Sequence, residues 1–206
     1  GYQDVIDRYE LASIDMDIEG KLLADTPAIK RQAAAIAAIQ KARPESDGLD
    51  VWLTLPVGPS GLTFEGAEAV RAYIAADVQL AGINAMTMNY NTGTDTDLTD
   101  TIIDSLNSTQ AQLRALYQEV DVNIGEATAW SRISATPMIG QNDVREDVFT
   151  VEDAQVLAKF SAEKGMSRLS MWSLNRDQAC GANWPDLRRV SDSCSGVTQA
   201  AGEFSK

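Results

Sequence analysis

Histidine is absent from this sequence of 206 residues, and cysteine occurs only twice. Without an imidazole, Ser-His-Asp and Cys-His catalysis are excluded, and so is any zinc site that includes histidine. Two thiols alone make a zinc site implausible, because structural zinc is held by four protein ligands. A zinc site is therefore not expected, and we expect no other metal and no cofactor.

Basic residues are also scarce: 17 Lys and Arg stand against 30 Asp and Glu, a formal net charge of −13. This charge disfavours nucleic acid and anionic membrane surfaces as partners, whereas a neutral ligand would be indifferent to it. No apolar run is long enough to cross a membrane. These features leave a neutral partner as the favoured expectation.

The two cysteines, Cys180 and Cys194, lie in a C-terminal segment rich in Gly, Ser, Asp and Pro. A disulfide is the favoured interpretation, and closing this loop would stabilise the fold by roughly 3 kcal/mol. Because disulfides persist in oxidising compartments, we expect a secreted, extracellular protein. Two reduced surface cysteines in a cytosolic protein are the alternative.

Strand-like and helix-like segments alternate along the chain. The apolar runs predict strands near 11–20, 49–57, 80–90, 133–140 and 168–174. Helices are expected between them, with Thr26, Thr63 and Thr150 as N-caps and one further helix over about 98–120. This alternation predicts an α/β fold with parallel strands and helical crossovers. In such folds, functional residues follow the carboxyl ends of the strands.

Three acids, Asp15, Asp17 and Glu19, alternate with apolar residues in the first strand. A period of two places all three side chains on one face of a strand. Like charges on adjacent same-face positions repel, and burying them is costly unless protons and hydrogen bonds are shared. Core formation does not require this pattern, although an exposed edge strand with a solvated acidic face would also produce it.

Acids, amides and aromatic residues also follow the later strands. Aromatic faces stack on sugar rings while amides and acids bond sugar hydroxyls, so these residues are typical of a carbohydrate site. The residues at these strand ends are Pro56; Met88, Asn89, Tyr90 and Asn91; Gln141, Asn142 and Asp143; and Trp172, Asn175 and Arg176.

Four segments carry a resemblance to a known family. SIDMDIEG (13–20) resembles the signature strand of glycoside hydrolase family 18, the chitinases, written DxxDxDxE. The last three acids match, while Ala12 stands where the pattern begins with Asp. MTMNYN (86–91), TPMIGQND (136–143) and SMWSLNRD (170–177) are similar to later strands of bacterial members, with Asn89 replacing an Asp.

The resemblance implies a (β/α)8 TIM barrel, of which this chain supplies strands four to eight. Residues 1–206 would then be a single catalytic domain whose N-terminal third lies outside this chain. Five strands cannot close such a barrel, so we expect the missing part of the barrel as a partner. A half-barrel stabilised by oligomerisation is the alternative.

The family resemblance also implies a mechanism. Glu19 would be the general acid and base of a substrate-assisted, retaining hydrolysis of β-1,4-linked N-acetylglucosamine polymers. Asp17 would orient the acetamido group of the substrate, and Asp15 would share a proton with Asp17. The expected substrate is chitin or its oligosaccharides, with endo action favoured.

The substrate-binding residues follow from the same resemblance. Trp172 would stack beneath the sugar. Met88 aligns with the Tyr that usually holds the acetamido oxygen, and Tyr90 would replace that Tyr because strand parity points it the same way. Met86, Asn89 and Gln141 complete the set, although barrel packing is the favoured interpretation of Met86 and Met88. A non-catalytic, lectin-like chitin-binding or interaction protein of the same fold is the alternative function.

Overall fold

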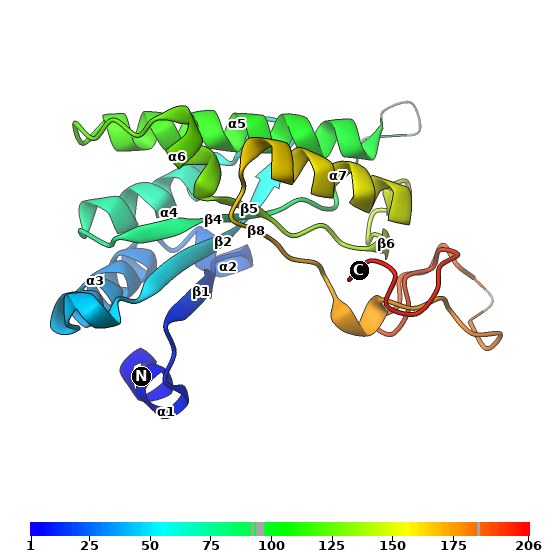
Figure 1. Cartoon of the computed structure of the whole chain (residues 1–206), viewed down its shortest axis with the longest axis horizontal. Coiled ribbons are helices and arrows are strands. Elements are labelled where there is room, and N and C mark those ends of the chain that lie inside the picture. The colour runs from blue at the N-terminus through cyan, green and yellow to red at the C-terminus, as the bar shows by residue number, and fades with distance from the viewer. Residues whose placement is uncertain (92, 94–96, 185) are drawn as a thin grey trace.

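The computed structural model describes residues 1–91, 93, 97–184 and 186–206. Its centre is a curled sheet of parallel strands in the order β1-β2-β4-β5-β8, with one short strand, β3, paired antiparallel to β2. The strands of this sheet are β1 (Ser13–Asp17), β2 (Asp50–Gly58), β3 (Gly61–Leu62), β4 (Leu80–Met86), β5 (Ile133–Ala135) and β8 (Arg168–Leu169). The sheet is therefore an open half-barrel, as Figure 1 shows.

Helices connect successive strands and cover the outer face of the sheet (Figure 1). The helices are α1 (Tyr2–Tyr9), α2 (Gly20–Leu23), α3 (Thr26–Ala42), α4 (Phe64–Ala75), α5 (Leu98–Gln118), α6 (Glu126–Ser131) and α7 (Val151–Lys164), with 3-10 turns at Glu45–Asp47 and Leu174–Arg176. A separate antiparallel pair, β6 (Gly140–Gln141) and β7 (Val148–Phe149), lies between β5 and α7 in the sequence. Within the described ranges, none of these helices is long and apolar enough to span a membrane.

The hydrophobic core lies between the sheet and these helices. Leu53 and Leu55 of β2 and Ile83 of β4 are fully buried against helix residues such as Ile102 and Leu106 of α5. Since side chains alternate across a strand, this apolar outer face leaves the other face of the sheet for polar residues. The polar inner face is where the acid strand contributes its carboxylates.

Helix starts follow local capping chemistry. Thr63 and Thr150 accept hydrogen bonds from the backbone N–H groups of Gly66 and Asp153, which confirms both as N-caps, and Asp153 completes a capping box. The prediction for Thr26 was wrong by one residue: Asp25 is the cap and accepts from the Ala28 N–H at 2.9 Å. An Asp carboxylate is as good an N-cap as a hydroxyl, and Pro fits either of the first two helical positions.

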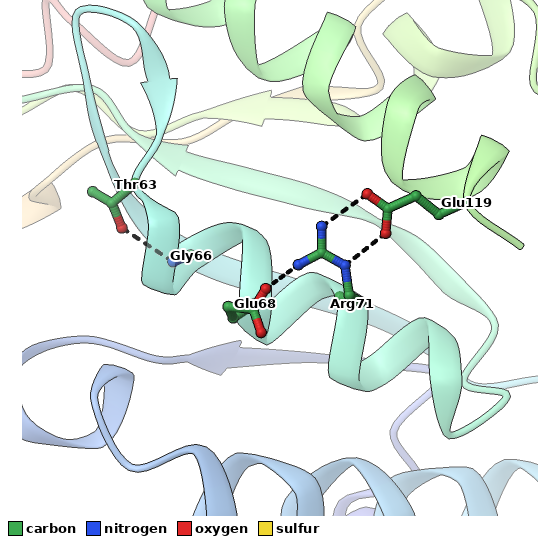
Figure 2. Close-up of polar contacts among 5 residues, drawn as sticks. All are labelled: Thr63, Gly66, Glu68, Arg71 and Glu119. Atoms are coloured by element: carbon green, nitrogen blue, oxygen red, sulfur yellow. Dashed lines mark hydrogen bonds and ion pairs between the residues drawn. The ribbon is translucent and has the colours of Figure 1, made fainter.

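An ion-pair cluster links α4 to the end of α5, as Figure 2 shows. Arg71 donates to both carboxylate oxygens of Glu119, at 2.6 and 2.8 Å, and also to Glu68 one turn earlier in α4. All three side chains are substantially exposed, so this cluster orients the two helices more than it stabilises them.

The five parallel strands are confirmed, but their extents differ from the sequence ranges. β5 and β8 are only three and two residues long, and an isolated bridge between Met138 and Trp172 continues their pairing. The sequence did not predict α1, α2, α6 or the short antiparallel strands. The Cys180–Cys194 disulfide is present, which confirms that expectation.

Candidate functional site

The acid strand ends at the carboxyl edge of the sheet. Met16 and Ile18 point outward and are buried, whereas Asp17 and Glu19 line a cavity of about 300 Å³. Glu19 is the N-cap residue of α2, and Gly20 next to it adopts φ +54°. Glycine adopts the left-handed backbone conformation without steric strain, so the chain can turn directly after Glu19 and leave this carboxylate at the strand end.

Strands from across the sheet contribute to the walls of this cavity. Its lining residues are Asp17, Glu19, Thr54, Met86, Met88, Asn89, Thr136, Met138, Asp143 and Trp172. The structure therefore brings together two of the three predicted catalytic acids and four of the six predicted substrate-binding residues.

Asp15 lies two residues before Asp17 on β1 and therefore on the same face of the strand. Its Oδ1 accepts a hydrogen bond from the Thr54 hydroxyl at 2.6 Å, and its Oδ2 accepts from Arg168 on β8. Both oxygens of Asp15 are thus engaged by groups other than Asp17. The expected sharing of a proton between Asp15 and Asp17 is not seen as a direct hydrogen bond among the described contacts.

Burial and charge act together on Asp17. Partial burial raises the pKa of the Asp17 carboxyl above its ordinary value, and the negative charge of Asp15 raises it further. Both effects disfavour the ionised form of Asp17. The acid strand therefore places Asp17, whose carboxyl holds its proton more firmly than an ordinary Asp, beside Glu19, the candidate general acid.

Trp172 forms an exposed apolar wall of the cavity. Its side chain is 54% exposed, while its backbone is fixed by hydrogen bonds to Pro137 O and from Ile139 N. The peptide bond between Trp172 and Ser173 is cis. A large ring held on a fixed backbone and open to solvent is suited to stacking on a flat ligand face.

Asn89 organises a loop rather than only facing a ligand. Its Oδ1 accepts from the Asp143 N–H at 2.9 Å, and its Nδ2 donates to Asp143 Oδ2 at 3.1 Å. Its own N–H donates to Asn142 Oδ1. These contacts bring Asp143, which the sequence placed at a strand end but not among the substrate-binding residues, into the lining of the cavity.

Tyr90 is not placed where strand parity predicted. β4 ends at Met86, and Asn89 has φ +58°, so the alternation of side chains is broken before Tyr90. Tyr90 does not line the cavity and instead packs against the hydrophobic core, where burial raises the pKa of its hydroxyl. The expected replacement of the acetamido-binding Tyr by Tyr90 is therefore not supported by its position.

Gln141 also lies outside the lining of the cavity. It is 3% exposed, and its amide nitrogen lies within hydrogen-bond distance of backbone carbonyls of the following turn, including Asn142, Val144 and Asp147. Its backbone N–H donates to Ser195 O at 2.7 Å. Gln141 therefore holds the turn that carries Asp143.

Several residues of the site were missed by sequence reasoning. Thr54 and Thr136 carry inward hydroxyls, Met138 adds a thioether, and Arg168 reaches Asp15 from the last strand. A period-two count back from Trp172 would have placed Arg168 on the inner face. Within the described ranges, no group of three or more His, Cys, Asp or Glu side chains is arranged to hold a metal ion.

Acids at the carboxyl ends of parallel strands, beside an exposed tryptophan, are the arrangement typical of barrel glycoside hydrolases. Comparison with curated proteins also finds proteins named as chitinases. The chain is 32% identical over 187 residues to a protein named probable bifunctional chitinase/lysozyme from Escherichia coli K12, covering 88% of this chain and 21% of that protein. It is 32% identical over 181 residues to endochitinase 11 of Metarhizium anisopliae, covering 85% of this chain and 35% of that protein.

Chitinase domains are among the solved structures similar to this chain. The catalytic domain of a hyperthermophilic chitinase from Pyrococcus furiosus is 30% identical, with a TM-score of 0.83 over 99% of this chain and 61% of that one. Catalytic-site mutants of active domain 2 of the chitinase from that organism, complexed with chito-oligosaccharides, superpose with the same TM-score at 29% identity. No family model matches the chain.

Sequence and fold together identify the chain as a chitinase-like domain of the glycoside hydrolase family 18 type. It spans 21% and 35% of the two curated relatives and 61% of the solved catalytic domain.

Proposed function

We propose that this protein is a glycoside hydrolase that cleaves chitin or its β-1,4-linked N-acetylglucosamine oligosaccharides, with endo action. One observation carries the proposal: Asp17, Glu19 and Trp172 open onto one cavity at the carboxyl end of the sheet. The names of the relatives and the likeness to chitinase catalytic domains support the same substrate class.

The proposed reaction is substrate-assisted and retaining. Glu19 donates its proton to the glycosidic oxygen, while the carbonyl oxygen of the 2-acetamido group attacks the anomeric carbon and displaces the leaving sugar. Asp17 accepts the acetamido N–H, which orients the group and stabilises the positive charge of the resulting oxazolinium ion. Glu19 then takes a proton from the water that opens this ion, so the anomeric configuration is retained.

The proposed architecture is a (β/α)8 barrel in which β1, β2, β4, β5 and β8 are strands four to eight. In the described part of the chain, β1 and β8 are each paired along one side only. Unpaired strand edges are prone to pair with other strands, so strands one to three would complete the barrel. A secreted location is also proposed, supported by the Cys180–Cys194 disulfide.

The decisive variant is Glu19→Gln, which keeps the shape of the side chain but removes its transferable proton. We expect it to abolish release of N-acetylglucosamine oligomers from colloidal chitin, measured by chromatography of the products. Glu163→Gln is the matched control, because Glu163 lies on α7, is 64% exposed and pairs only loosely with Lys159 at 3.9 Å.

Two results would overturn the proposal. Equal release of oligomers by Glu19→Gln and the unaltered protein would remove Glu19 from the reaction. Binding of chito-oligosaccharides without any hydrolysis by the unaltered protein would instead establish the lectin-like alternative.

A further inference from the structure

Arg168 enters the interior of the curled sheet from its last strand. Its guanidinium forms an ion pair with Asp15 on β1, at the opposite end of the strand order. The guanidinium carbon also lies 4.1 Å from the centre of the Trp52 ring on β2. The side chains of Arg168 and Asp15 are 31% and 33% exposed, so solvent screens their attraction only in part.

The ring beneath Arg168 is built into the sheet. Trp52 is 7% exposed and lies beside Gly82 of β4, where a Cβ atom would meet the ring carbon Cζ3 at 2.4 Å and the Arg132 carbonyl oxygen at 2.3 Å. Only glycine leaves room at position 82 for this ring and this backbone. A guanidinium over an aromatic face is held by cation–π attraction as well as by its ion pair.

The Oδ1 atom of Asp15 accepts the last of three consecutive hydrogen bonds. The Thr136 hydroxyl donates to Asn84 Oδ1 at 2.8 Å, and Asn84 Nδ2 donates to Thr54 Oγ1 at 2.9 Å. Thr54 therefore uses its own proton to donate to Asp15 Oδ1 at 2.6 Å. Every donor in this chain points toward Asp15, which favours a carboxylate at that position.

We propose that Arg168 is a positioning residue of the acid strand, which holds Asp15 through their ion pair and opposes protonation of the acid pair, Asp15 and Asp17. Asp17, unlike Asp15, lines the cavity beside Glu19. The placement of the charges can be measured without substrate, whereas its consequence for catalysis rests on the proposed function.

Other titratable groups face this pair from neighbouring elements. Glu19 and Asp143 share the cavity with Asp17, and Tyr2 of α1 lines the groove on the other side of β1 with both acids. In the described part of the chain, Arg168 is the basic residue in contact with the pair. Its removal therefore leaves the repulsion among the acids unopposed at this position.

The sign of the effect follows from the proposed mechanism. Asp17 must be a carboxylate when it accepts the acetamido N–H, so its protonation produces the acid limb of kcat/KM. Removing the positive charge of Arg168 makes protonation of the pair easier. The acid limb of Arg168→Met should therefore move to higher pH by about one unit. At a fixed pH on that limb, this shift corresponds to a roughly tenfold loss of kcat/KM.

Two arginine variants provide the comparison. Arg168→Lys keeps the charge, so we expect it to retain the position of the acid limb, even if packing over Trp52 is impaired. Arg132→Met is the matched control, because Arg132 also lies over an aromatic ring, 5.0 Å from the centre of Tyr117, and has no acid of the site as a partner. A merely structural role of Arg168 would lower stability or kcat without moving the limb.

A substrate-free measurement separates this inference from the proposed function. With ¹³C labels at the aspartate carboxyls, an NMR titration should show Asp15 and Asp17 taking up their first proton at a higher pH in Arg168→Met than in the unaltered protein. If chitin is not hydrolysed but this titration behaves as expected, the function fails and the role of Arg168 stands. The role is overturned if Arg168→Met leaves the titration of Asp15 and Asp17 unchanged.

Discussion

Asn89 and Asp143 form a reciprocal hydrogen-bonded pair in the lining of the cavity, with Asn89 Nδ2 donating to Asp143 Oδ2 at 3.1 Å and Asp143 N–H donating to Asn89 Oδ1 at 2.9 Å. The chain segments that carry them are 54 residues apart in sequence. This reciprocal pair connects the end of β4 to the loop after β6 and fixes part of the cavity wall.

Exchanging the two residues tests this pair. Asn89→Asp places a second carboxylate against Asp143, so we expect kcat/KM for chito-oligosaccharides to fall several-fold because the loop is pushed away. The double variant Asn89→Asp with Asp143→Asn restores one donor and one acceptor, and should recover most of the loss. A double-mutant cycle on kcat/KM should give a coupling of about 1 kcal/mol, and additive effects of the two changes would contradict the pairing.

Trp172 should contribute mainly to binding. Trp172→Ala removes the apolar wall of the cavity, and we expect about tenfold weaker binding of chito-oligosaccharides, or ~1.4 kcal/mol, measured by titration calorimetry. Trp184→Ala is the control, because Trp184 lies in the disulfide loop over Arg189 and does not line the cavity. Equal losses in both variants would point to a general effect on the C-terminal segment instead of stacking.

Asp177 should make stability depend on pH. Although burial alone would raise its pKa, hydrogen bonds from the Phe204 and Ser205 N–H groups and the Gln199 amide lower the pKa of this carboxyl. A lowered folded-state pKa stabilises the fold above the ordinary Asp value of about 3.9, and this stabilisation is lost as pH falls through the lowered pKa.

Asp177→Asn should therefore lower the free energy of unfolding by about 1–2 kcal/mol at pH 7, measured by urea denaturation. The difference from the unaltered protein should shrink as pH falls below the ordinary Asp value. Asp104→Asn is the control at an exposed position on α5. A pH-independent difference for Asp177→Asn would contradict the assignment to the charged carboxylate.

The disulfide should stabilise the C-terminal segment and, through it, the cavity wall. Ser195, next to Cys194, accepts a hydrogen bond from the Gln141 N–H, and Gly140 packs on the same residue, where a Cβ atom would meet Ser195 O at 2.0 Å. Replacing both cysteines by serine should lower the free energy of unfolding by up to about 3 kcal/mol. Because the chain has only these two cysteines, a reductant should reproduce the effect in the unaltered protein and have none in the double variant.

Much of the fold could be predicted because its signals are local. Apolar runs marked the five parallel strands, and Thr63 and Thr150 marked two helix starts through their own side chains. Short elements such as α2 and β6 carried no such signal: four residues of helix and two of strand are too few to show a periodicity. Their existence depends on what packs beside them.

The candidate site, like the fold, could be predicted only where the signal in the sequence is local. The period of two in the acid strand correctly placed Asp17 and Glu19 on one face, because alternation follows from backbone geometry alone. The same rule failed at Tyr90, since the left-handed conformation of Asn89 ends the alternation. Gln141 lies outside the cavity lining for a different reason: its turn brings backbone carbonyls close to its amide nitrogen.

The sequence by itself determined which residues could carry acid chemistry, because it contains no histidine and places three carboxylates on one face of a strand. The tertiary structure alone decided which groups those carboxylates meet. Arg168 and Asp15 are 153 residues apart, and their contact exists only because the sheet curls until its first and last strands face each other. No local pattern encodes that curvature, since it arises from the combined twist and packing of all five strands.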